Sequence, residues 1–208
     1  MKFLLSLTVL AAACTALAQG TSEAILGYSA NTGQFVNGTA GWTFQPTNTA
    51  FSVTITSLGC FDAAFVNGVT NIQVGLWGPD GSLLASNSVT TSSTEFDQSR
   101  YVSITPVALT PTLIYQIGVF NSGGLSLDIA DPAIGGSVSN SPDIQLDGIA
   151  SSTSGFVSPV LQVGTAGSIY VGPNFQYQRS SPVPEPCSCL LLSLGALLLA
   201  ARRRPQRL

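Results

Sequence analysis

Short runs of alternating or β-branched residues recur between residues 20 and 180, separated by Gly, Asn, Pro, Asp and Ser. No apolar pattern with the period of a long amphipathic helix appears in this stretch. Such spacing is typical of an antiparallel sandwich or barrel. The sequence therefore predicts an all-β chain, and the expected strands are 41–45, 50–57, 72–78, 83–89, 100–105, 114–120, 125–129, 144–149, 156–162 and 168–171, with a last extended piece at 174–177.

Turn and loop signals divide these strands. Residues 51–57 alternate apolar and hydroxyl side chains, as a half-buried strand requires. Residues 78–81 read Gly-Pro-Asp-Gly and predict a hairpin turn, because Pro presets φ and Gly accepts a positive φ. Pro106 and Pro111 are expected to flank a loop. Residues 121–142 are rich in Gly, Ser and Asp and are expected to form a long loop or a weak edge region.

The beginning of the sequence has the three-part layout of a secretory signal peptide. Lys2 supplies a positive charge, residues 3–13 are apolar, and Ala16 and Ala18 are small residues that a signal peptidase accepts. The apolar run is too short to span a hydrocarbon core of about 30 Å. We therefore expect cleavage after Ala18, which makes Gln19 the first residue of the mature protein.

The end of the sequence combines three features. An apolar segment at 187–201 would be about 22 Å long as a helix, which is short for a permanent anchor but long enough to lodge in a membrane. Three arginines then close it, and they are expected to stop translocation and stay in the cytoplasm. They are Arg202, Arg203 and Arg204, and the residues that precede the apolar segment are Val183, Pro184, Glu185 and Pro186.

This tail resembles the PEP-CTERM sorting signal over residues 183 to 204, because all three parts occur in order in a chain with a signal peptide. The resemblance implies processing by an exosortase, a membrane transpeptidase-like enzyme that would cut near Pro184, Glu185 and Pro186. The expected partners are then signal peptidase, the exosortase and the membrane. The expected location is an inner-membrane intermediate, followed by the cell surface or the extracellular space of a bacterium.

A second resemblance covers about residues 27 to 177. The runs at 41–44, 53–59, 73–77 and 81–86 are similar to an uncharacterised β-sandwich family that is common in PEP-CTERM proteins. It implies a single jelly-roll-like antiparallel β-sandwich with no known chemistry. The expected organisation is a signal peptide at 1–18, the sandwich at 19–178, a Pro/Ser linker with the sorting motif at 179–186, a transmembrane helix at 187–201 and a basic cytoplasmic tail at 202–208.

The cysteines leave lipidation open at both ends. A lipoprotein would be cleaved before Cys14, although Ala11 occupies a position where a bulky aliphatic residue is normal. Cys187 and Cys189 are either lipidated or small apolar residues of the tail, and the latter interpretation is favoured. Cys60 is the lone cysteine of the central domain, and its apolar neighbours predict a packed core residue.

Charge excludes one class of partner. Between residues 19 and 182 the chain has nine acidic residues against Arg100 and Arg179, a formal net charge of −7. A domain with this balance does not bind nucleic acid by neutralising phosphates. Its polar surface must come from Ser, Thr, Asn, Gln and Gly, which suits an extracellular β-protein.

Few residues suggest catalysis or metal binding. The chain has no His, so no Ser-His-Asp triad and no His metal ligand are available. Paired carboxylates could hydrolyse glycosides, and calcium is the one metal for which loop acids are candidates. The carboxylate pairs are Glu95 with Asp97 and Asp128 with Asp131, and the calcium candidates are Asp128, Asp131, Asp143 and Asp147.

These observations predict a non-enzymatic structural or adhesive protein of the cell surface or extracellular matrix, without a cofactor. One alternative is a secreted carbohydrate-binding module, with extracellular polysaccharide as the partner. The other is a secreted polysaccharide hydrolase. The aromatic residues that could stack on sugars are more often core residues on alternating strands, and they are Trp42, Trp77, Tyr101 and Tyr115.

Overall fold

The computed structural model describes residues 20–47, 49, 51–66, 68–162 and 166–180, and these residues form antiparallel β-sheets. The predicted all-β class is confirmed. The predicted signal peptide, sorting motif, transmembrane helix at 187–201 and basic tail lie outside the described residues. Among the residues that the structure describes, no helix is long and apolar enough to cross a membrane.

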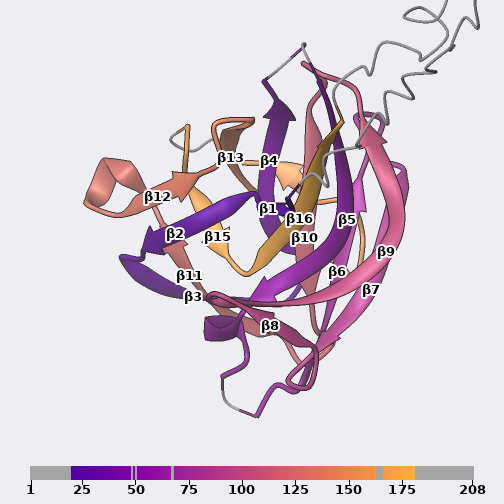
Figure 1. Cartoon of the computed structure of the whole chain (residues 1–208). Helices are drawn as coiled ribbons and strands as arrows, with labels where there is room; N and C mark the ends of the chain where they lie inside the picture. Colours follow the sequence, from indigo (N-terminus) through magenta and orange to yellow (C-terminus); the bar gives the residue numbers. More distant parts are fainter. Residues whose placement is uncertain (1–19, 48, 50, 67, 163–165, 181–208) are drawn as a thin grey trace, which may run out of the picture. The chain divides into compact units, whose positions relative to one another are not determined.

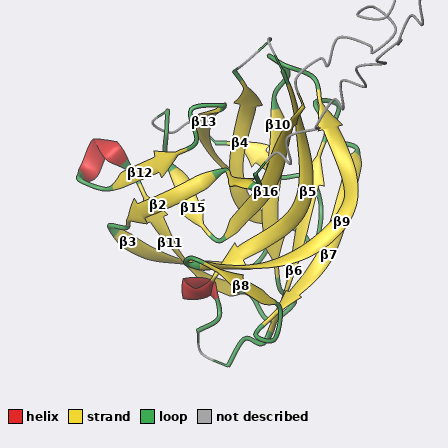
Figure 2. Ribbon diagram, in the orientation of Figure 1, coloured by secondary structure: helices red, strands yellow, loops and turns green. Residues whose placement is uncertain are grey.

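Two larger sheets contain most of the strands (Figures 1 and 2). The five-stranded sheet has the order β1 (Ser22–Glu23), β16 (Pro173–Ser180), β5 (Ser52–Phe61), β9 (Ser99–Leu109) and β8 (Thr94–Phe96). The six-stranded sheet has the order β14 (Val160–Leu161), β13 (Ile144–Ser151), β4 (Ala40–Pro46), β10 (Tyr115–Phe120), β6 (Asn71–Trp77) and β7 (Leu83–Thr90).

Two smaller sheets lie to the left in Figure 1. One has the order β15 (Ile169–Val171), β11 (Leu125–Ala130) and β3 (Thr32–Val36), and the other pairs β12 (Ser137–Asn140) with β2 (Ile25–Ser29). Short 3₁₀ turns at Asp62–Ala64 and Pro132–Ile134 complete the described elements. The expected strand at 125–129 is therefore realised as β11, and the rest of the stretch 121–142 holds a 3₁₀ turn and the edge strand β12.

Aromatic side chains join the two larger sheets. Trp42 and Phe44 on β4 meet Phe175 on β16, with ring centroids 5.8 and 4.9 Å apart, and all three rings are fully buried. Trp42 also donates from Nε1 to the carbonyl oxygen of Pro173 at 3.1 Å, which satisfies its polar atom inside the core. The core thus sits between β4 and the last strand of the chain.

A β-bulge in β5 changes which side chains face inward. The pairing of β5 with β9 shifts between Ile55 and Ser57, and the pairing with β16 shifts at the same place. Val53 and Ile55 are buried before the shift, whereas Leu58 and Cys60 are buried after it. Because a bulge inserts one unpaired residue, the alternation changes phase there, and Ser57 turns to the outer face instead of continuing the inward series.

The same irregularity explains why Pro106 lies inside β9 rather than in a loop. Between the pairs Ile55 with Val107 and Ser57 with Ser103, the two strands are out of register. Pro cannot donate a ladder hydrogen bond, so it is tolerated in a strand where pairing is interrupted. The expected loop between the prolines is correspondingly shorter and begins after Leu109.

Of three other expected elements, the structure confirms one turn, shortens one strand and lengthens another. The hairpin turn is confirmed, since Gly81 N donates to Gly78 O at 2.9 Å and Gly81 has φ of 77°. The predicted strand at 156–162 is reduced to Val160–Leu161, because Phe156 packs its ring against Trp77, 5.1 Å between centroids. The last strand extends to Ser180, two residues past the expected end of the domain.

The aromatic cluster supports a stability prediction. Replacing Phe175 by Ala removes a fully buried ring that contacts Trp42 and Phe44. We expect a loss of about 3–5 kcal/mol in the free energy of unfolding, from lost burial and the remaining cavity. Urea titration followed by circular dichroism measures it. Phe35→Ala is the control, because Phe35 is 65% exposed and its loss should cost less than about 0.5 kcal/mol.

Candidate functional site

The outer face of the five-stranded sheet carries a groove with a volume of about 550 Å³. Its lining is mostly hydroxyl groups, together with an amide and two aromatic rings. The lining residues are Thr21, Ser57, Ser92, Ser93, Thr94, Phe96, Tyr101, Val102, Ser103 and Gln176. These come from segments at both ends and in the middle of the domain, which the sheet order brings onto one face.

Strand pairing places the lining side chains together. Tyr101 pairs with Thr94 of β8 and with Gly59 of β5, and Ser103 pairs with Ser57. Ser57 in turn pairs with Gln176 of β16, and Gln176 pairs with Glu23 of β1. Because directly paired residues point to the same face of a sheet, two adjacent rows of side chains, one through Tyr101 and one through Ser103, together span all five strands.

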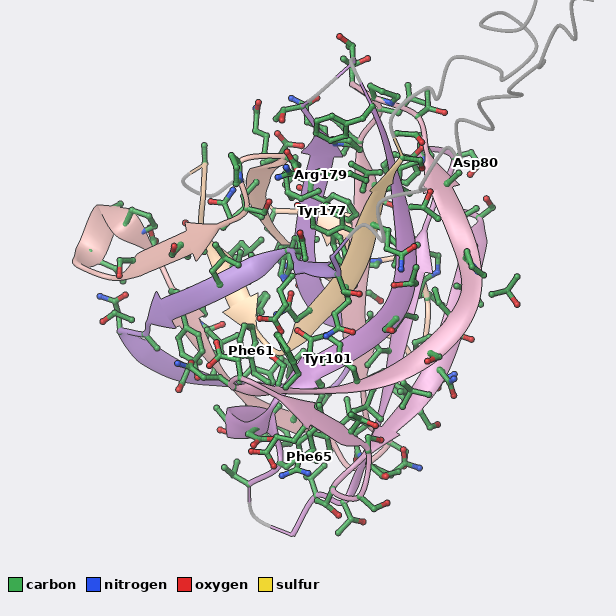
Figure 3. All side chains as sticks on the ribbon, in the orientation of Figure 1. Phe61, Phe65, Asp80, Tyr101, Tyr177 and Arg179 are labelled. Atoms are coloured by element: carbon green, nitrogen blue, oxygen red, sulfur yellow. The ribbon has the colours of Figure 1, made fainter. Side chains whose placement is uncertain are left out.

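Tyr101 forms the floor of the groove and lies across the sheet. Its hydroxyl donates to the carboxylate of Glu23, which is two strands beyond β5. Gly59 makes this path possible, because a Cβ there would lie 2.3 Å from Tyr101 Cδ1 and 2.8 Å from the carbonyl oxygen of Arg100. Figure 3 labels Tyr101 near Phe61, toward the end of the sheet where β8 lies.

Glu23 is a buried carboxyl group with a perturbed titration. Only 7% of Glu23 is exposed. Burial raises the pKa of Glu23 above its ordinary value of 4.5, the hydrogen bond from Tyr101 opposes this, and the charge of Asp97 adds to it. Burial and the bond to Glu23 likewise raise the pKa of Tyr101. Burial is thus the largest cause of the raised pKa in both groups.

Phe96 is the exposed aromatic residue of the groove. It ends β8, a strand whose three residues are all exposed, and 53% of its own surface is accessible. The hairpin from β8 to β9 turns over Asp97 and Gln98, and Asp97 accepts φ of 52°. Asp tolerates this left-handed conformation better than most residues, so the short turn presents Phe96 at the rim.

A second polar cluster fixes the other end of β16. Asp143 is buried and accepts from Tyr177 Oη at 2.7 Å and from Arg179 Nε at 2.5 Å, while Ser141 also hydrogen-bonds the Tyr177 hydroxyl. The Arg179 guanidinium lies over the Phe51 ring, 5.2 Å from its centroid. Figure 3 shows Tyr177 and Arg179 together on this strand, away from Tyr101. These side chains bind one another within the domain, which indicates that the cluster stabilises the fold rather than binding a ligand.

A second groove, of about 760 Å³, separates the edge of β7 from the outer half of β9. Asn87 crosses it, donating from Nδ2 to Ser103 O at 3.3 Å and accepting from Ser88 N at 2.8 Å. The Asn87 side chain joins the two sheets at that edge. It also occupies the carbonyl oxygen of Ser103, which a strand bound in this groove would need as an acceptor.

The four aromatic residues considered as a sugar platform are buried. Trp42, Trp77, Tyr101 and Tyr115 are each at most 5% exposed. The interpretation of these residues as buried rather than as an exposed platform is confirmed, although Tyr101 lies under the groove and is not part of the cluster between the sheets. Cys60 is also a packed core residue, as predicted. Its side chain is fully buried, and burial raises the pKa of its thiol.

The acidic residues considered as catalytic pairs or calcium ligands each have different neighbours. Glu95 is exposed and pairs with Arg100 at 3.1 Å, and Asp97 lies in the turn that follows. Asp131 caps a 3₁₀ turn by accepting from Ala133 N at 2.9 Å, Asp143 holds Arg179, and Asp147 contacts Gln145 at 3.5 Å. Asp128 lies beside Gly33, where a Cβ would be 3.3 Å from its Oδ1. Among the residues that the structure describes, no three acidic or thiol side chains gather as metal ligands would.

Sequence reasoning missed Glu23, Phe96 and Gln176 as site residues. One signal was present for Phe96, because it stands between Glu95 and Asp97, and an aromatic residue flanked by two acids is hard to bury. No local signal exists for Glu23 and Gln176. They reach the groove through pairing between the first and last strands.

The approach of Tyr101 to Gly59 supports a second prediction. Gly59→Ala forces the Tyr101 ring and the neighbouring backbone apart, so we expect a loss of about 1–3 kcal/mol in the free energy of unfolding. Gly27→Ala is the matched control, because no atom lies within 4 Å of its added Cβ. Thermal melts of both variants measure the difference. Equal melting temperatures would contradict the tight crossing of Tyr101 over β5.

A third prediction follows from the raised pKa of Glu23. The folded state binds more protons than the unfolded state between the two pKa values, so stability falls as pH rises through that window. Glu23→Gln keeps an acceptor for Tyr101 and removes the charge, so the variant should gain stability relative to the parent as the pH rises above 4.5. Urea unfolding across this range measures the gain. Asp80→Asn should instead lose stability relative to the parent by the same amount throughout this range, because hydrogen bonds from Ser82 lower the pKa of Asp80 and their contribution is lost only below pH 3.8.

Comparisons with known proteins indicate no family for the chain. No protein-family model matches it, and no curated protein matches it. Among solved structures, it is similar at 13% sequence identity to the VP2 subviral particle of infectious bursal disease virus, in its crystal structure. The match covers 90% of this chain and 50% of the viral chain, with a TM-score of 0.26. The chain thus spans half the length of that protein, and a likeness at this TM-score carries no argument.

Proposed function

We propose that this chain is an exported bacterial protein of the cell surface or extracellular matrix, sorted by its C-terminal tail and acting without catalysis. The observation that carries the proposal is the order of features in residues 183 to 204, with Pro184, Glu185 and Pro186 followed by an apolar segment and three arginines. The signal-peptide layout of residues 1–18 supports it, because a sorting tail acts only on a chain that has entered the export route.

The processing partners in this proposal are signal peptidase at the N-terminal end and an exosortase at the tail. The arginines stay in the cytoplasm because charge is expensive to move through hydrocarbon. The chain then pauses in the inner membrane with the Pro-Glu-Pro motif on the outer side. Cleavage near Glu185 passes the domain to the surface or releases it.

The position of β16 is compatible with such a cut. The strand ends at Ser180, and three residues separate it from Pro184. Removal of the chain after Pro186 therefore leaves every described strand and the Asp143–Arg179 ion pair in the released part. A product cut at this motif keeps the contacts that close the fold.

We further propose that the domain is a jelly-roll-like β-sandwich whose role is structural or adhesive. Its two larger sheets bury Trp42 and Phe44 against Phe175, as the layers of a sandwich do. Its outer surface is rich in hydroxyl groups, and its two described arginines are engaged in ion pairs. Such a surface remains hydrated and does not depend on charge for contact with a matrix.

Mass spectrometry of the mature protein from its native host tests the sorting proposal. We expect a first residue at Gln19 and loss of the residues that follow the Pro-Glu-Pro motif. Glu185→Ala should abolish the C-terminal cut and accumulate membrane-bound precursor. Gln206→Ala is the matched control, because it alters a polar tail residue outside the motif and should leave processing unchanged.

Retention of residues 187–208 in the mature protein would replace sorting by a simple tail anchor. Equal processing of the Glu185→Ala variant and the parent would remove the motif from the mechanism. Both results concern the tail alone, so they leave the properties of the folded domain to separate measurements.

A further inference from the structure

The groove over Tyr101 offers hydrogen-bonding side chains from several strands. Thr94 and Ser103 are exposed and Gln176 is half-buried, and all three line the same groove. A hydroxyl or amide group can both donate and accept. The central strands β5 and β16 each have a paired neighbour on both sides, so a ligand on the floor meets side chains rather than a free strand edge.

Phe96 adds an apolar surface to this polar groove. Its ring is 53% exposed at the rim, and its strand partner is Ser99 on β9. Burying part of such a ring against an apolar face releases hydration water and favours association, at about 25 cal/mol per Å² of apolar area. The groove thus combines an open aromatic ring with hydroxyl and amide groups.

The charges around the groove select against an anionic ligand. Within the described residues the cations are Arg100 and Arg179. Arg100 pairs with Asp62 at 2.8 Å and Glu95 at 3.1 Å, and Arg179 pairs with Asp143 at 2.5 Å. The buried carboxylate of Glu23 already accepts from Tyr101, the residue of the groove floor. An anion finds no unengaged arginine, and the formal charge of −7 between residues 19 and 182 repels it.

We propose that this groove binds a segment of neutral polysaccharide. Sugar rings have hydroxyl groups at their edges that match Thr94, Ser103 and Gln176, and apolar C–H faces that match Phe96. The groove volume of about 550 Å³ lies within the roughly 300–1,000 Å³ of small-molecule sites, enough for a short stretch of a longer chain. The proposal stands on the folded domain and does not depend on the sorting tail.

Binding assays on the full chain, purified in detergent, test this site. The probes are neutral oligosaccharides of glucan, xylan, mannan and galactan type, with an alginate oligosaccharide as the anionic comparator, all measured by calorimetry. We expect at least one neutral probe to bind and alginate to bind at least about tenfold more weakly. Phe96→Ala should weaken binding by about tenfold or more, which corresponds to the loss of one stacking contact.

Phe35→Ala provides the matched control. Phe35 is 65% exposed on β3 and is absent from the groove lining, so its loss should leave affinity unchanged. Because Phe96 is also exposed, its variant should melt at the temperature of the parent. Ser103→Ala is the second variant and should weaken the same probe by severalfold through one lost hydrogen bond.

Three outcomes would overturn the proposal: no heat with any neutral probe, equal losses in the Phe96 and Phe35 variants, or tighter binding of alginate. None of them bears on cleavage near Glu185, since the assay uses uncleaved protein. A failed sorting experiment would likewise leave the binding result unaffected.

Discussion

The fold depends on the last strand occupying the middle of a sheet. Strand β16 lies between β1 and β5, so it satisfies hydrogen-bonding groups on both of its edges. It also contributes Phe175 and Tyr177 to the core. Asn174 at its start bonds both the backbone nitrogen and the carbonyl oxygen of Ile25, 149 positions earlier. Contacts between residues so far apart in the sequence are expected to form late in folding, because closing a long loop costs conformational entropy before the contacts compensate for it. The domain cannot close until residues 173–180 are available, and these residues directly precede the tail.

Because the domain has few charged residues, apolar packing and hydrogen bonds stabilise the contact of β16 with the rest of the fold. Both described arginines are used inside the domain: Arg100 joins Asp62, Glu95 and the carbonyl of Thr91, and Arg179 joins Asp143. Exposed ion pairs contribute little, but the buried partner Asp143 would be costly if it lost its arginine. Arg179 therefore contributes to stability chiefly by satisfying a buried carboxylate at the end of β16.

The sequence was most informative where local chemistry determines structure. The Gly-Pro-Asp-Gly turn and the alternation of Val53 and Ile55 are local patterns, and both are realised. Prediction failed where distant pairing decides: the bulge in β5 opposite β16 turns Ser57 outward, and the register shift between β5 and β9 allows Pro106 within β9. Strands β2 and β12 were missed because their residues, ILGYS and SVSN, are short and weakly patterned and gain order from each other. Phe156 was assigned to a strand, yet burial against Trp77 outweighs its strand propensity.

The groove shows the same division between local and distant causes. A strand-by-strand reading finds a glycine at position 59 and a tyrosine at position 101, with nothing to relate them. Pairing of β5 with β9 sets Tyr101 beside Gly59, and the missing side chain lets the ring extend over β5 toward Glu23 on β1. Since β1 pairs only with β16 in this sheet, the floor is complete only after the last strand has joined. The closure that satisfies the core therefore also assembles the surface on which a ligand would be held.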